Sequence, residues 1–142
     1  MTDRRSLAKQ INVGVKLPTT QVFTANGTWT RPVGCKQVRV IVTAGGGSGG
    51  SHATATEGSG GAGGTAIEYI DVTSTSSETV TIGAAGAATS GAGNGNAGGT
   101  SSFGAYNSAT GGAGGVAAGA AGGAGTGGNI NLTGGSGESQ KA

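Results

Sequence analysis

The stretch GGAGGVAAGAAGGAGTGG, residues 111–128, has one branched side chain, Val116, and one hydroxyl, Thr126; its other residues are glycine and alanine. No charged residue occurs from residue 79 to residue 137. Ordering a backbone costs about 1–2 kcal/mol per residue, and side chains this small cannot offset that cost by burial. This part of the chain is therefore either disordered or stabilised by contacts between backbones.

Composition favours backbone contacts over disorder. Disordered chains combine low hydrophobicity with high net charge, whereas this chain has 34 glycines in 142 residues, a net charge of +2 and only 10% charged residues. Collagen needs glycine at every third position, and Ala113, Val116 and Asn131 break that period. We therefore predict polyglycine-II-type extended strands over residues 83–137, in which glycine allows backbones to approach closely and to satisfy one another's N–H and C=O groups.

The larger apolar residues lie mainly in residues 20–82, where the pattern predicts β-strands. Val38, Val40 and Val42 lie on one face of a predicted strand, with Arg39, Ile41 and Thr43 on the other. Two further strands are predicted in TAIEYIDV (residues 65–72) and ETVTIG (residues 78–83), joined by a Ser/Thr-rich connection. The predicted fold class is all-β: a small antiparallel sheet or sandwich with glycine-rich loops and polyglycine-II-type extended strands.

A hairpin is predicted at the start of this region. Residues 22–24 and 28–30 flank Asn26-Gly27, and Asn-Gly supplies the positive-φ pair of a two-residue hairpin turn. Residues 18–142 form the predicted glycine-rich β-domain.

Residues 1–17 form a predicted arm preceding the domain. Its INVGV segment alternates as a short strand does, although Thr2 or Asp3 could equally cap a helical turn. Seven of the eight basic residues lie in residues 1–43, but they are scattered, so we predict no nucleic-acid binding. As an anchor, the arm would use these residues: Arg4, Arg5, Leu7, Lys9, Ile11, Val13 and Val15.

The sequence predicts a protein without catalytic activity. His52 is the only histidine and Cys35 the only cysteine, so there is no pair of soft ligands for zinc and no spacing typical of a nucleophile with its base. We expect no catalytic residue, no cofactor and no metal ion.

Polar residues between the glycine runs are the candidates for binding. Asn, Thr, Tyr and His on short loops suit polar surface ligands such as glycans or outer-membrane loops. The alternative is that they only form turns of the glycine layer, and that Phe103 and Tyr106 pack on the sheet. The candidate contact residues are His52, Thr54, Thr56, Glu57, Asn94, Asn96, Tyr106 and Asn107.

The sequence resembles the glycine-rich domain of tail-fibre and receptor-binding (adhesin-like) proteins of tailed bacteriophages. The resemblance rests on VFTANGTWTRP followed by a valine-rich strand entering Gly45-Gly46-Gly47, and on SFG and SATGG at residues 102–104 and 108–112. It implies a virion appendage, such as a short tail fibre, that mediates host attachment through a host glycan or an outer-membrane protein. It also implies other tail or baseplate proteins as partners, and a homo-oligomer, expected to be a trimer.

Two other functions fit the same sequence. One is a purely structural collar, baseplate or fibre-anchoring component without a host ligand. The other is a cellular glycine-rich surface or antifreeze-like protein, which the phage-like opening segment disfavours.

Overall fold

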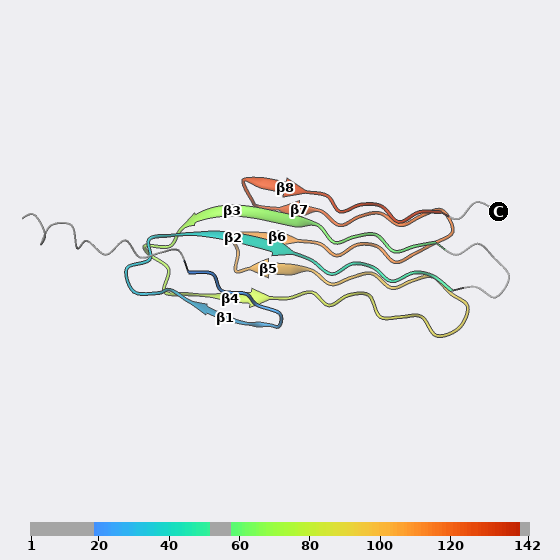
Figure 1. Ribbon diagram of the computed structural model, residues 1–142, viewed down its shortest axis with the longest axis horizontal. Helices are drawn as coiled ribbons and strands as arrows, with labels where there is room; N and C mark the ends of the chain where they lie inside the picture. The colour runs from blue at the N-terminus through green and yellow to red at the C-terminus, as the bar shows by residue number, and fades with distance from the viewer. Residues whose placement is uncertain (1–18, 52–57, 140–142) are drawn as a thin grey trace, which may run out of the picture.

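A computed structural model describes residues 19–51 and 58–139. These residues form an elongated all-β molecule with the β-strands at one end and thin extended segments reaching the other (Figure 1). The strands form two antiparallel sheets, in the orders β1-β4-β5-β6-β7 and β2-β3-β8. The bounds are β1 Gly27–Thr30, β2 Gln37–Thr43, β3 Thr65–Asp71, β4 Ser77–Thr81, β5 Ser101–Phe103, β6 Asn107–Ala109, β7 Gly125–Thr126 and β8 Ile130–Leu132. The predicted fold class is therefore confirmed.

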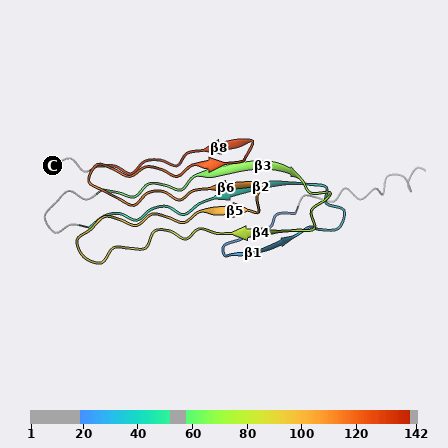
Figure 2. The same ribbon diagram turned by 180° about the vertical axis from the view of Figure 1, so that it is seen from behind.

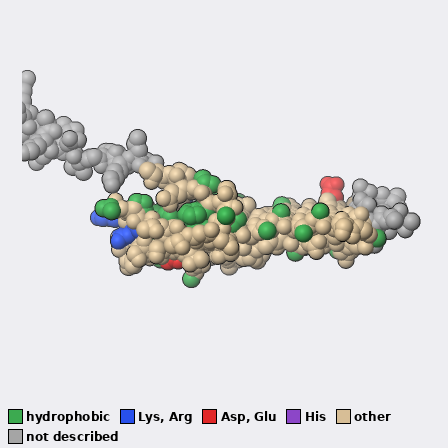
Figure 3. Space-filling view, turned by 90° about the horizontal axis from the view of Figure 1, so that it is seen from below, with side chains coloured by type: hydrophobic (Ala, Val, Ile, Leu, Met, Phe, Trp, Pro, Cys, Tyr) green, Lys and Arg blue, Asp and Glu red, His purple; other side chains and the backbone are tan. Residues whose placement is uncertain are grey.

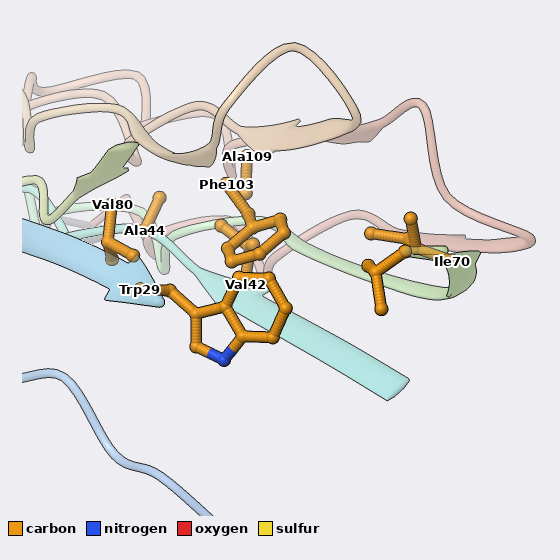
Figure 4. Packing of buried hydrophobic residues seen from close by; sticks show 8 residues of the cluster. Trp29, Val42, Ala44, Ile70, Val80, Phe103 and Ala109 are labelled. Atoms are coloured by element: carbon orange, nitrogen blue, oxygen red, sulfur yellow. The ribbon is translucent and has the colours of Figure 1, made fainter. Parts of the chain in front are cut away.

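A small apolar core separates the two sheets. Val42 of β2 is buried while its neighbours Ile41 and Thr43 are exposed, as the alternation in the sequence predicts. The Trp29 and Phe103 rings meet edge to face with centroids 5.6 Å apart, close to Val42 (Figure 4). The buried members of this core are Trp29, Val42, Ala44, Ile70, Val72, Val80, Phe103 and Ala109.

The predicted hairpin at Asn26-Gly27 is wrong. β1 begins at Gly27 but pairs with β4, with Trp29 opposite Glu78, and no residue of 22–24 belongs to a strand. Positive φ angles occur only at glycines elsewhere in the described chain, so the tight hairpin turn does not form. Instead, Asn26 Oδ1 accepts a hydrogen bond from the Ile82 N–H at 2.7 Å, which fastens the start of β1 to β4.

The predicted strands at 65–72 and 78–83 both form, but they lie in different sheets. β3 pairs with β2 and β8, whereas β4 pairs with β1 and β5. The connection between them crosses from one sheet to the other beside the fully buried Val72. The short strands β5–β8 also interrupt the predicted polyglycine zone. They occur where larger side chains, such as that of Phe103, reappear in the sequence.

Beyond the sandwich, each of the strands β2–β8 is continuous with one extended segment, here called its rod. The two views from front and back show these rods running side by side to the far end (Figures 1 and 2). The rods comprise residues 44–51 (β2), 58–64 (β3), 83–90 (β4), 93–100 (β5), 110–116 (β6), 120–124 (β7) and 133–139 (β8). The β2 and β3 rods come from the first glycine run, outside the zone predicted for polyglycine II.

Hydrogen bonds between the rods repeat every three residues. N–H groups of the β2 rod donate to the β3 rod at 2.9–3.1 Å: Ala44 to Gly64, Gly47 to Gly61 and Gly50 to Gly58. Its next N–H groups donate to the β5 rod at 2.8–3.2 Å: Gly45 to Gly99, Ser48 to Asn96 and Ser51 to Gly93. Three residues per turn with outward-pointing backbone groups is the geometry of polyglycine II. The rods therefore bond within each layer and also between the layers.

Glycine is required where rods meet in the middle of this bundle. A Cβ on Gly112 of the β6 rod would overlap the carbonyl group of Gly61 of the β3 rod. A Cβ on Gly122 would overlap Gly134, and one on Gly125 would overlap Thr65. Any residue with a Cβ atom is excluded at these positions, because the neighbouring atoms belong to the backbone and cannot move aside as a flexible side chain can.

Candidate functional site

The free ends of the rods form a tip at the end of the molecule opposite the sandwich (Figure 1). Ser51, the last residue of the β2 rod, and Gly93, the first of the β5 rod, exchange two backbone hydrogen bonds of 2.8 and 2.5 Å. Gly58 packs against the backbone of Val116, where the β6 rod ends. These contacts hold together the chain connections that surround the tip.

The first group of predicted contact residues belongs to the connection between the β2 and β3 rods. His52, Thr54, Thr56 and Glu57 lie outside the described residues, but their flanking residues, Ser51 and Gly58, are both fixed at the tip. The two described residues that flank this segment in the chain therefore both lie at the tip.

The structure brings Asn94 close to Ser51, at the tip. Asn94 follows Gly93, which is paired to Ser51, and its side chain is exposed. The tip thus offers an exposed amide close to Ser51.

Asn96 has bonds within the bundle. Its side-chain Nδ2 donates to the Ala87 carbonyl at 2.9 Å, and its backbone N–H donates to Ser48 Oγ at 2.8 Å. These two bonds tie the β5 rod to the β4 and β2 rods, as the turn-forming alternative expects.

Tyr106 and Asn107 lie on the β5–β6 hairpin in the sandwich and are not brought together with the tip. The Tyr106 hydroxyl is 2.7 Å from Thr75 Oγ1, and its ring lies 6.1 Å from that of Phe103, so both aromatic rings pack on the sheet as predicted. Asn107 is only 3% exposed, and its side-chain amide has no partner among the described residues. The predicted contact residues that the structure describes are thus divided between the rods and the sandwich.

A second concave surface, missed by the sequence analysis, lies at the open edge of the sandwich. It is a groove of about 1300 Å³ between residues 19–23 and the edges formed by β1 and β2. Figure 3 shows hydrophobic side chains in this hollow. Its apolar lining includes Val22, Phe23, Trp29, Val38, Val40 and Phe103. The sequence analysis missed the groove because it predicted that residues 22–24 form a hairpin strand paired with residues 28–30.

Titratable groups are sparse around these surfaces. Hydrogen bonds from the side chain and backbone of Thr73, together with the charge of Lys36, lower the pKa of the Asp71 carboxyl below its usual 3.8. Within residues 19–51 and 58–139, no three His, Cys, Asp or Glu side chains are grouped so that they could hold a metal ion. The geometry supports binding through hydrogen bonds and apolar contacts.

The described chain also matches a known family in sequence. Residues 19–142 match the family described as a glycine-rich domain. The chain belongs to the glycine-rich domain family. The match covers both the sandwich and the rods of this glycine-rich domain. Comparison with curated proteins finds no match. The described residues include no helix long and apolar enough to cross a membrane.

Proposed function

We propose that this glycine-rich domain protein is a virion appendage of a tailed bacteriophage, a short tail fibre or receptor-binding protein that mediates host attachment. The opening segment with Phe23, Trp29 and Pro32, and the valine-rich strand that enters polyglycine, support the proposal through their resemblance to such proteins. Membership of the glycine-rich domain family is compatible with it. So is a thin molecule that carries polar residues at one extremity.

The observation that carries the proposal is the exposed Asn94 at the tip, beside the pair of Gly93 with Ser51, the residue that precedes 52–57 in the chain. Rigid elements that present short polar loops are a common arrangement for ligand binding. The ligand would be a host glycan or an outer-membrane protein, contacted by amides, hydroxyls and His52.

Host-cell binding by purified protein tests this role. Replacing Asn94 and the polar residues of 52–57 by alanine should weaken binding at least about tenfold, equivalent to about 1.4 kcal/mol. A matched control is Thr28→Ala, which changes an exposed hydroxyl residue on β1, in the sandwich at the other end of the molecule (Figure 1). Unchanged binding by the tip variant would contradict receptor binding at the tip.

Attachment to the virion is assigned to residues 1–17, which lie outside the described residues. Arg4, Arg5 and Lys9 would pair with acidic groups of another tail or baseplate protein, and Ile11, Val13 and Val15 would add a strand to it. Particles assembled with protein lacking residues 1–17 should lack the appendage. Retention of the truncated protein on the particle would show that the arm is not the anchor.

The second candidate function is a purely structural virion component with no host ligand. The inward hydrogen bonds of Asn96, and that of Thr89 Oγ1 to the Gly49 carbonyl at 3.2 Å, favour it, because polar side chains near the tip are used to hold the bundle. Normal adsorption by phage carrying the tip alanine variant would support this function over receptor binding.

A further inference from the structure

The outer face of the three-stranded sheet carries an apolar patch. Ile41 of β2, Ile67 of β3 and Ile130 of β8 are register partners, and residues paired across antiparallel strands point to the same side. Because Val42, Ala66 and Ile70 face the core, this row of isoleucines faces outward. Ile41 and Ile130 are 54% and 53% exposed.

Two more large side chains extend the patch along the strands. Leu132 lies opposite Thr65 and is 50% exposed, and Tyr69 lies opposite Arg39 and is 57% exposed. We call Ile41, Ile67, Tyr69, Ile130 and Leu132 the outer patch. In a chain with so few large apolar residues, a contiguous exposed group of this kind marks an interaction surface. A solvated sheet face would instead carry polar residues at these positions.

One charge of each sign flanks the outer patch on the same face. Arg39 lies next along β2 from Ile41, and Asp71 lies next along β3 from Tyr69. The Thr73 N–H donates to Asp71 Oδ1 at 2.8 Å, and this bond with the charge of Lys36 stabilises the Asp71 carboxylate. This face therefore presents a cation and an anion beside the outer patch.

We propose that the outer patch packs against the same patch of a second copy of this chain, with Arg39 of each copy facing Asp71 of the other. A membrane surface or a partner of one charge sign would complement only one of Arg39 and Asp71. A second copy presents both charges, as an isologous contact requires.

The order of residues along the strands also fixes the direction of the second copy. The isoleucine row, the Arg39–Tyr69 pair and Asp71 follow one another along the strands. Only an axis parallel to the strands sets the two isoleucine rows against each other while keeping Arg39 close to the other copy's Asp71. The two rod bundles then run in parallel, with both tips at the same end. This inference does not depend on the proposed phage function, because it concerns the purified chain alone.

Sedimentation of the full chain tests the interface through its apolar centre. The wild type should sediment as an oligomer, and Ile130→Asp should shift it toward the 13.2 kDa single chain by raising the dissociation constant at least about tenfold. Because Ile130 is half exposed, the circular dichroism spectrum should change little and would show that the variant still folds. The matched control is Val22→Asp, which changes an 80% exposed valine of the edge groove and should leave the oligomer intact.

Charge reversal tests the pairing between copies. Arg39→Glu and Asp71→Arg should each sediment as single chains, because each places like charges together across the interface. Mixed in equal amounts, they should co-assemble, because one copy then carries negative charges at positions 39 and 71 and the other copy carries positive charges at both. Within each variant chain the two side chains still carry like charges, so rescue cannot come from a bond within one chain. A monomeric wild type, an oligomer lost in Val22→Asp instead, or a mixture that stays dissociated would overturn the proposal.

Discussion

The sandwich and the rods are built from the same continuous strands but are held together differently. In the sandwich, the two sheets are hydrogen-bonded only within themselves, and Trp29, Val42 and Phe103 fill the space between them. Sheets separated by side chains pack about 10 Å apart. In the rods, N–H groups of one layer reach carbonyls of the other, as from Ser48 to Asn96 at 2.9 Å. Side-chain size alone decides whether two layers enclose a core or bond directly.

The two regions therefore differ in what can destabilise them. A sandwich loses stability when a core side chain is removed, because transfer energy and packing are lost. A rod bundle has few side chains larger than alanine to lose, but it does not tolerate added atoms where glycines lie directly against neighbouring backbone. Substitutions that shorten a side chain should therefore destabilise the sandwich most, and substitutions that enlarge a glycine should destabilise the rods most.

The largest expected effect is Gly112→Val, in the middle of the rods. Its Cβ would overlap the carbonyl of Gly61, and the Gly112 N–H bond to Gly45, 3.0 Å long, would be lost as the rods separate. Overpacking a close-packed interior typically costs about 1–3 kcal/mol, and overlap with fixed backbone should exceed that range. Urea unfolding followed by circular dichroism measures the loss. Stability equal to wild type would show that the rods are not close-packed.

Trp29→Ala should cost about 3–5 kcal/mol, the range for removing a large aromatic side chain from a core. Trp29 is 7% exposed and its ring contacts Phe103. Hydrogen exchange should show lost protection in β1 and β4 before the rods lose theirs. Simultaneous loss in both regions would mean that sandwich and rods unfold as one unit.

Asn26→Ala should cost about 1 kcal/mol, the contribution of one typical hydrogen bond. It removes the acceptor of the Ile82 N–H and should loosen the start of β1 without disturbing the rods. A thermal melt of this variant beside Thr24→Ala, an exposed neighbour, gives the comparison. Equal melting temperatures would show that this bond does not hold β1 to β4.

The smallest effect, and one of opposite sign, is expected for Gly135→Ala on the β8 rod. A Cβ there would meet no atom within 4 Å, and the φ angle of Gly135 is not positive. Replacing such a glycine by alanine stabilises a protein by about 0.4–1 kcal/mol, because the unfolded chain has less freedom to lose. Destabilisation at Gly135 would indicate that something packs against this outer rod.

Local patterns predicted much of this fold. The alternation around Val40 and Val42 identified β2 and its buried face, and the absence of charge and of large side chains indicated backbone packing for residues 83–137. Long-range pairing was not predictable in the same way. Asn26-Gly27 has the composition of a hairpin turn, but the partner of β1 is β4, about fifty residues later. The sequence around Asn26 carries no signal for the register of β1 with a distant strand. It also carries none for the hydrogen bond that the Ile82 N–H donates to Asn26.

The candidate site was predictable only in part for the same reason. Polar interruptions in polyglycine indicate loops, so residues 52–57 and Asn94 could be singled out from sequence. The position of Asn94 close to Ser51 depends on the Ser51–Gly93 pairing, and the placement of Tyr106 and Asn107 at the opposite end depends on the short β5–β6 hairpin. The outer patch needs the register of Ile41, Ile67 and Ile130, which come from three separate strands.

The three-residue repeat of hydrogen bonds in the rods has a mechanical consequence. The bonds lie across the rods, so tension between the tip and the sandwich would load them in shear, and many would have to fail together. Each rod is also linked to more than one neighbour, as the β2 rod is to the β3, β5 and β6 rods. When one hydrogen bond breaks, the bonds to the other neighbouring rods still carry the force, so the bundle does not open one bond at a time.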